Sequence, residues 1–115
     1  MALALLALSI DCGDAAKLAA FWAAALGLPA DPGARPESAA ITPGATGPRL
    51  LFHQVPEPKT VKNRLHLDLI SNTFEAESQR LAALGASWIR DATKGSARWT
   101  TFADPEGNEF DLIAG

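Results

Sequence analysis

The tetrapeptide AALG occurs twice in this chain of 115 residues, at 24–27 and again at 82–85. Each copy ends a segment whose apolar residues recur at helical spacing, and each segment follows a stretch that alternates in polarity. The first helix is predicted over 15–26, with Asp14 as its N-cap and Gly27 after its end. Alanine and leucine could repeat by chance, but the shared order of elements favours two copies of one ancestral half.

The rest of the chain is predicted to be strand and loop, with one further helix. Strands are predicted at 3–11, 38–42, 49–55, 65–70, 88–90, 97–103 and 109–113. The second helix is predicted over 73–84, and the proline-rich segment 29–48 is mostly loop. The residues DPEGN at 104–108 form a tight turn, because proline presets φ while glycine and asparagine tolerate positive φ.

Alternation assigns the side chains of the second half to two faces. The apolar positions, which require a core, are Leu65, Leu67, Leu69, Phe110 and Leu112. The polar positions between them, which we expect on the opposite face, are His66, Asp68, Glu109 and Asp111.

Composition excludes several classes of protein. Ten Lys plus Arg against 13 Asp plus Glu give a formal charge of −3, and no basic run is present, so nucleic-acid binding is not expected. The apolar run 1–10 is too short to cross a bilayer, and no basic residue precedes Lys17, so neither a membrane span nor a signal peptide is expected. Cys12 is the only cysteine, which excludes an intrachain disulfide and favours the cytoplasm.

These motifs together give the chain a family resemblance. They are the Phe21–Trp22 pair and Leu26–Gly27 of the first helix, His66 at the start of the strand predicted over 65–70, and the stretch DPEGNEFDL at 104–112. The chain resembles the glyoxalase/bleomycin-resistance/extradiol-dioxygenase superfamily, also called vicinal-oxygen-chelate proteins, in its small glyoxalase-like branch. The resemblance covers essentially the whole chain.

The resemblance implies a fold and an assembly. We expect one α+β domain over 1–115, built from two tandem βαβββ modules at about 1–57 and 62–115. The modules would form a curved mixed sheet around a cavity, with the helices on the convex face. Short two-module chains of this superfamily commonly pair or swap halves, so a homodimer is expected, with the cavity formed either within one chain or across the dimer.

The resemblance also implies a metal site, which this chain keeps only in part. The family's four ligand positions fall on Ala7, His53, His66 and Asp111, and alanine offers no ligand atom. Two imidazoles and a carboxylate remain, which is the composition of a facial triad for divalent Fe, Mn, Ni or Zn with positions open for substrate. His53 is placed by a 58-residue offset that pairs it with Asp111. In the alternative, these side chains are only hydrogen-bonded, and the cavity binds an organic molecule without metal.

A basic cluster in the hinge between the halves is a candidate anion site. Lys59, Lys62 and Arg64 precede the strand that carries His66. They would either hold a carboxylate or phosphate at the mouth of the cavity or be solvated and paired with acidic neighbours. Arg64 is the member that we expect to bind substrate.

Three further residues are expected to contribute to the site. Trp99 would offer a flat stacking wall if it faces the cavity, and Asp68 would contact substrate beside His66. Glu109 would act as a general base if it is buried, or be solvated after the turn.

Two functional classes therefore remain open for a small-molecule-binding protein. One is a metal-dependent lyase, isomerase or dioxygenase acting on an organic substrate with vicinal oxygens. The other is a non-catalytic protein that sequesters its ligand without metal, as drug-binding bleomycin-resistance relatives do. The fold alone does not separate them.

Overall fold

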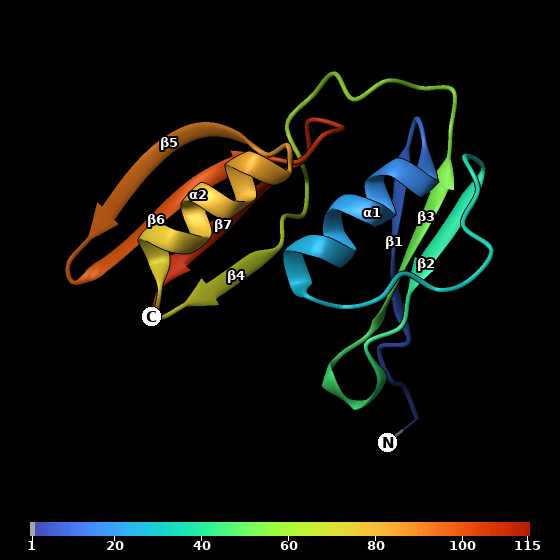
Figure 1. Ribbon diagram of the computed structural model, residues 1–115, viewed down its shortest axis with the longest axis horizontal. Helices are drawn as coiled ribbons and strands as arrows, with labels where there is room; N and C mark the ends of the chain where they lie inside the picture. Colours follow the sequence, from blue (N-terminus) through green and yellow to red (C-terminus); the bar gives the residue numbers. More distant parts are fainter. Residues whose placement is uncertain (1) are drawn as a thin grey trace. The chain divides into compact units, whose positions relative to one another are not determined.

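The chain forms two compact units in the computed structural model, which describes residues 2–115 (Figure 1). The first unit ends at Pro58, and the second runs from Lys59 to Gly115. Each unit has one helix lying across one face of its own mixed sheet. The predicted α+β class, with strand, helix and strands in each half, is confirmed.

The first unit has three strands. Its elements are β1 (Ala7–Cys12), α1 (Ala15–Leu26), β2 (Ser38–Ile41), the short 3₁₀ helix η1 (Gly44–Thr46) and β3 (Arg49–Gln54). The strand order is β1-β3-β2, with β1 parallel and β2 antiparallel to β3. A fourth strand is reduced to one bridge between Arg35 and Ser38, because prolines in 29–36 lack the amide donors that a ladder requires.

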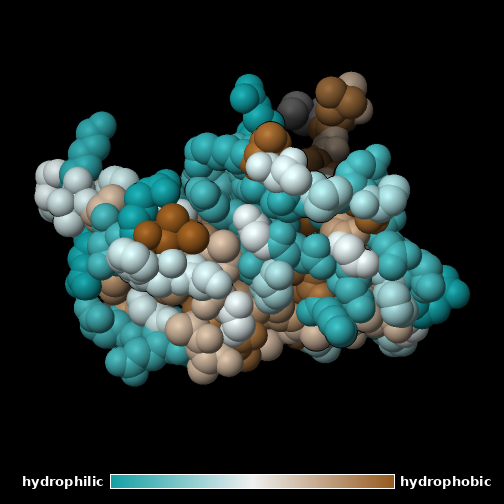
Figure 2. All heavy atoms as spheres, turned by 90° about the horizontal axis from the view of Figure 1, so that it is seen from above, coloured by the Kyte–Doolittle hydropathy of each residue, from teal (hydrophilic) through white to brown (hydrophobic). Residues whose placement is uncertain are grey.

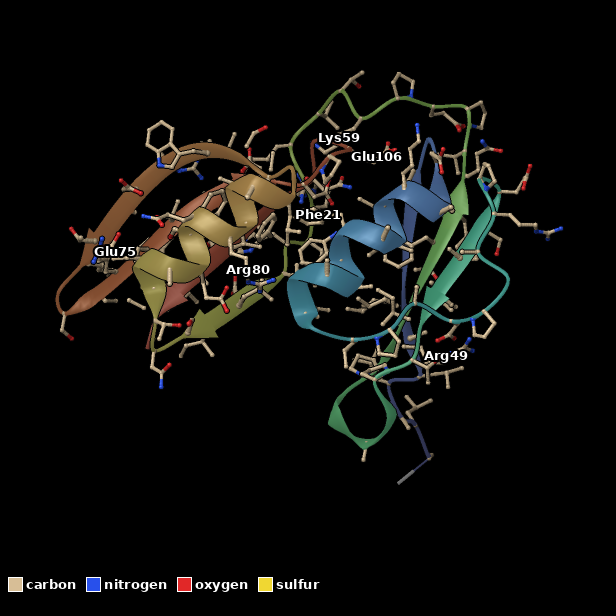
Figure 3. The ribbon with its side chains drawn as sticks, viewed as in Figure 1. Phe21, Arg49, Lys59, Glu75, Arg80 and Glu106 are labelled. Carbon is tan, nitrogen blue, oxygen red and sulfur yellow. The ribbon has the colours of Figure 1, made fainter. Side chains whose placement is uncertain are left out.

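The predicted first helix is confirmed with its caps. The Asp14 side chain accepts a hydrogen bond of 3.1 Å from the Lys17 amide, and Gly27 takes the left-handed conformation that ends the helix. Trp22 is buried, and the Phe21 ring meets it edge-on at 5.3 Å (Figure 3). Phe52 of β3 is fully buried on the helix side of the sheet.

The second unit has the full βαβββ order. Its elements are β4 (Asp68–Ser71), α2 (Phe74–Leu84), β5 (Ser87–Lys94), β6 (Ala97–Ala103) and β7 (Glu109–Ala114). The strand order is β4-β7-β6-β5, with β4 parallel to β7 and the other pairs antiparallel. Buried side chains lie between α2 and the sheet, and they include Phe74 and Leu81 of the helix and Phe102, Phe110 and Leu112 of the strands. We call the opposite side of this sheet the open face.

The core position predicted for Leu65 is wrong. Leu65 is 70% exposed because β4 begins only at Asp68, and Leu6, inside the strand predicted over 3–11, is 75% exposed because β1 begins only at Ala7. Before those residues neither segment runs as a paired strand, so the alternation in the sequence does not bury its apolar side. His66 consequently lies in the segment that leads into β4 rather than inside a strand.

The turn before β7 matches its prediction. The Asp104 carboxylate accepts hydrogen bonds of 2.9 and 3.0 Å from the amides of Glu106 and Asn108, and Gly107 has a φ of 87°. This network fixes the point at which β7 starts, and therefore the register of Asp111.

Polar side chains cover most of the face seen in Figure 2, with apolar groups among them. The most exposed large apolar residues include Leu3, Leu5, Val61, Ile70 and Trp88. No helix within residues 2–115 has the length and apolarity to span a bilayer.

Candidate functional site

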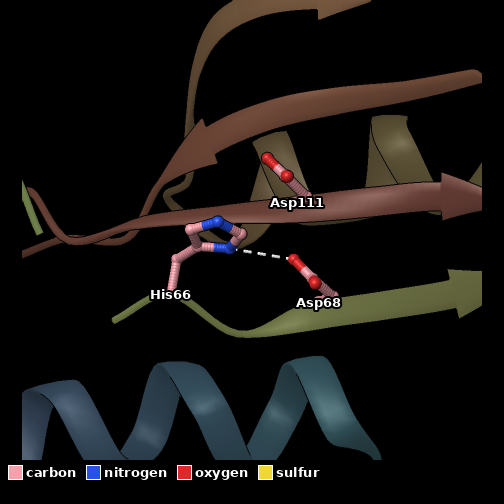
Figure 4. Close-up of side chains that lie close together, drawn as sticks. All are labelled: His66, Asp68 and Asp111. Carbon is pink, nitrogen blue, oxygen red and sulfur yellow. Dashed lines mark ion pairs between the residues drawn. The ribbon is translucent and has the colours of Figure 1, made fainter. Parts of the chain in front are cut away.

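Three ionisable side chains meet on the open face of the second unit (Figure 4). Asp68 begins β4, Asp111 lies beside it in β7, and His66 precedes β4 by two residues. His66 Nδ1 is 2.9 Å from Asp68 Oδ1. One ligand atom from each of the three side chains lies within 4.8 Å of the others. The structure therefore brings together three of the residues singled out in the sequence.

Asp111 is held in place from two sides. Its carboxylate accepts a 2.5 Å hydrogen bond from the Thr101 hydroxyl, and its amide donates to the Leu67 carbonyl at 3.0 Å. Arg98, on the helix side of the same strand, pairs with Glu75 at 2.6 Å and covers the Phe74 ring. Thr101 is therefore the side chain that fixes the Asp111 carboxylate.

The strand register places these residues in one row across the sheet. From β5 to β4 the directly paired residues are Arg90, Thr101, Asp111 and Asp68. We call them the polar row. Paired residues on neighbouring strands have side chains on the same face, about 5 Å apart at Cβ. The polar row is therefore a continuous strip of hydrogen-bonding groups over four strands.

An apolar row runs beside the polar row on the same face. Its directly paired residues are Ala92, Trp99, Ile113 and Ile70. Trp99 is half-buried and lies two residues from Thr101 along β6, so its ring belongs to the face of Asp111. An aromatic ring beside a polar strip is the usual make-up of a site for a small organic ligand.

Glu109 is engaged in ion pairs at one end of the open face. Lys62 Nζ donates to its carboxylate at 3.0 Å, Arg90 Nη2 lies 3.9 Å away, and Asn63 Nδ2 donates to its carbonyl at 2.9 Å. The hydrogen bond from Lys62 lowers the pKa of the Glu109 carboxyl, which outweighs the opposing effect of burial. A carboxylate with a lowered pKa is a weaker base, so this arrangement disfavours the expected role of general base.

Other members of the predicted basic cluster have different surroundings. Lys59 donates to the Val61 carbonyl and adds positive potential at Glu109. Arg64 is exposed and makes no ion pair within residues 2–115. Its role in binding substrate stays a prediction.

The first unit has a different row at the same place. In the second unit Asp111 pairs with Asp68, and the 59-residue offset of the first strands equates Asp68 with Ser9. Ser9 pairs with Leu51, so the counterpart of Asp111 is Leu51. The offset of 58 that matched His53 to Asp111 therefore differs by two residues along β3 from the equivalence that strand pairing gives.

His53 therefore lies outside the row that corresponds to the polar row. It pairs with Asp11 on one side and Ser38 on the other, and it is exposed. Ala7, the other first-unit ligand position, pairs with Arg49. The role of His53 as a metal ligand stays a prediction, because it belongs to the first unit and the three clustered groups to the second.

The cluster suits a divalent metal by its chemistry. One imidazole and two carboxylates are ligands that Mn, Fe and Zn accept, and three protein donors leave positions for a ligand. His66 Nδ1 and Asp68 Oδ1 are 2.9 Å apart, a spacing that suits neighbouring ligands of one ion.

Two contributors, Thr101 and Arg90, escaped the sequence reasoning. Asp68 was expected to contact substrate, and the parallel pairing of the first and last strands places it beside Asp111. Arg90 was missed because a bulge in β5 sets its side, and no periodicity reveals a bulge.

Comparison with known proteins supplies the family. Residues 7–113 match the family model described as a glyoxalase-like domain. No match was found among the curated proteins.

Solved structures share this fold at low identity. A glyoxalase/bleomycin resistance protein/dioxygenase family enzyme from Burkholderia phytofirmans PsJN is 16% identical with a TM-score of 0.79, covering 97% of this chain and 98% of its own. A mutant of the fosfomycin resistance protein FosX from Listeria monocytogenes, complexed with Mn(II) and a dihydroxypropylphosphonic acid, is 15% identical with a TM-score of 0.75, covering 100% and 91%. Lactoylglutathione lyase from Agrobacterium tumefaciens is 15% identical with a TM-score of 0.68, covering 97% and 93%.

Proposed function

This chain belongs to the glyoxalase-like domain family of the vicinal-oxygen-chelate superfamily, and we propose that it binds a small organic molecule on the open face of its second unit. The observation that carries the proposal is the convergence of His66, Asp68 and Asp111, with ligand atoms within 4.8 Å of one another. The apolar row beside them offers the surface on which the carbon skeleton of a ligand would lie.

We propose that the cluster holds a divalent metal, with Fe, Mn, Ni and Zn as the candidates. His66, Asp68 and Asp111 would be its ligands, and Thr101 would fix the Asp111 carboxylate. A divalent ion held there supplies a Lewis acid for two adjacent oxygens of a ligand, as lyase, isomerase and dioxygenase chemistry requires. The FosX mutant was solved as a complex with Mn(II), which supports including Mn²⁺ among the metals to test.

A second candidate function is ligand sequestration without metal or catalysis. It is favoured by Ala7 and Leu51, which stand at first-unit positions and carry no metal-ligating atom. A ligand would then be held by hydrogen bonds to the polar row and by stacking on Trp99.

Metal analysis of protein purified without a histidine tag separates the two candidates. The catalytic candidate predicts about one equivalent of Fe, Mn, Ni or Zn per chain, or micromolar affinity for Mn²⁺ or Zn²⁺ by calorimetry. His66→Ala should abolish this binding, and His53→Ala is the matched control, because these are the only two histidines. Metal binding lost equally in both variants would instead support a site that includes His53. Protein that binds no metal and still binds small aromatic acids would support sequestration.

We also propose a homodimer in a reducing compartment such as the cytoplasm, with both units in one domain. β1 and β4 are edge strands of their own sheets, and Ile70 of β4 is 73% exposed, which favours pairing with further chain. Cys12 is the single cysteine of the sequence and is buried, so no intrachain disulfide can form. Sedimentation equilibrium tests the dimer, and a monomer at micromolar concentration contradicts it.

A further inference from the structure

A bulge in β5 turns Arg90 onto the open face. Ser87 and Trp88 pair with Ala103 and Phe102, but the next pair is Arg90 with Thr101, so Ile89 is the extra residue. Trp88 shares the helix side with Phe102. Without the bulge, Arg90 would lie on that same side, because side chains alternate along a strand. One inserted residue thus adds a guanidinium to the end of the polar row.

The Arg90 guanidinium is only loosely held there. Its one ion pair within residues 2–115 is with Glu109, at 3.9 Å, which is beyond hydrogen-bond distance. The side chain is 54% exposed. Glu109 is already bonded to Lys62 at 3.0 Å, so the two cations share one carboxylate. This leaves net positive charge and several N–H donors facing the strip.

The distance between Arg90 and Asp111 along the polar row limits the length of a ligand that contacts both. Arg90 lies two strands from Asp111, which is roughly 10 Å at the backbone. Side chains that lean toward each other shorten this span to about the length of a substituted six-membered ring. Trp99, in the adjacent apolar row, would face such a ring.

We propose that Arg90 binds the acid group of the ligand, and that the ligand is therefore a small organic anion with an oxygen function at its other end. The inference rests on the proposed function, because it assigns a substrate class to the same open face. Arg90 receives the carboxylate, phosphonate or phosphate while Lys62 stays paired with Glu109, Thr101 lies at the middle, and the His66–Asp68–Asp111 cluster receives the distal oxygen. A guanidinium fork matches the two oxygens of such a group.

Two probes of equal shape test the charge requirement. We choose 4-hydroxybenzoate and 4-hydroxybenzamide, which differ only in the acid group, and follow the backbone amide signals of Arg90, Thr101 and Asp111 by NMR titration. Wild-type protein should bind the benzoate about tenfold more tightly than the benzamide, the effect of one charge-assisted hydrogen bond. Arg90→Gln should remove the preference, and Arg90→Lys should keep part of it.

Arg80→Gln is the matched control, because it removes the same charge from α2, on the other side of the sheet (Figure 3). It should keep the full preference. Equal binding of both probes by wild type, with shifts at Thr101 and Asp111, overturns this inference and leaves the proposed function standing. A preference that survives Arg90→Gln also overturns it. Failure of both probes to bind contradicts the inference and the open face as a ligand site, while the metal measurement still tests the cluster separately.

Discussion

The two units place different chemistry on the same row of the same half-fold. Where the second unit has Asp68, Asp111 and Thr101 in register, the first has Ser9, Leu51 and Ala40. Two carboxylates and a hydroxyl correspond to one hydroxyl and two apolar side chains. The difference indicates that the capacity to bind a polar ligand or a metal is concentrated in the second unit.

On the side of each sheet that faces the helix, in contrast, the two units have the same kind of side chain. Facing the helix, Phe52 corresponds to Leu112 and Ile41 to Phe102, and all four are nearly fully buried. Burial of apolar area against a helix stabilises both copies, so this side keeps its character. The other side differs between the two units, which is why function has to be argued from the row rather than from the fold.

The largest expected effect is on the side that the two units share. Phe52→Ala and Phe110→Ala remove rings that are 0% and 1% exposed, and each should cost about 3–5 kcal/mol of unfolding free energy because a cavity is left. Denaturant unfolding measures both. A cost below about 1 kcal/mol in one unit only would contradict the equivalence of the two helix sides.

The next largest expected effect is a loss of binding affinity, on the face of the sheet where the two units differ. Asp111→Ala should reduce metal or ligand affinity by tenfold or more, because it removes a carboxylate donor and the acceptor of the Thr101 hydroxyl. Leu51→Ala, at the corresponding position of the first unit, should leave affinity unchanged. Calorimetric titration with Mn²⁺ and with a small organic acid compares the two. An equal loss in Leu51→Ala would show that the first unit contributes to binding.

Sequence reasoning predicted which side chains lie on the open face of the second unit, because short-range patterns determine that placement. Alternation identified His66, Asp68 and Asp111 on one side, and the turn at Asp104 fixed the start of β7. It gave no register for His53, since the position of β3 relative to β1 depends on strand pairing between residues about 40 apart. A register error of two residues leaves a side chain on the same face of the sheet but in another row, so the periodicity of the sequence does not reveal the error.

The same limit explains the errors at strand ends. Leu65 and Leu6 continue the alternation of real strands, but burial requires a paired strand and a helix above it, and neither reaches these residues. The bulge at Ile89 is a further case, because its only trace is the pairing of Arg90 with Thr101.

The smallest expected effect concerns β5, the strand that has no full counterpart among the described residues of the first unit. The Asp91 carboxylate accepts hydrogen bonds from the Thr100 hydroxyl at 2.6 Å and the Trp88 indole at 3.1 Å, which hold its pKa below the usual value. Because the folded pKa lies below the unfolded one, this contribution is complete above the unfolded pKa and is lost as pH falls through the folded pKa. Wild type should therefore lose slightly more thermal stability between about pH 6 and pH 3 than Asp91→Asn, with a change in Trp88 emission that the variant lacks. Identical pH profiles of the two proteins would show that the Asp91 side chain does not stabilise the pairing of β5 with β6. Backbone hydrogen bonds alone would then hold β5 in the sheet.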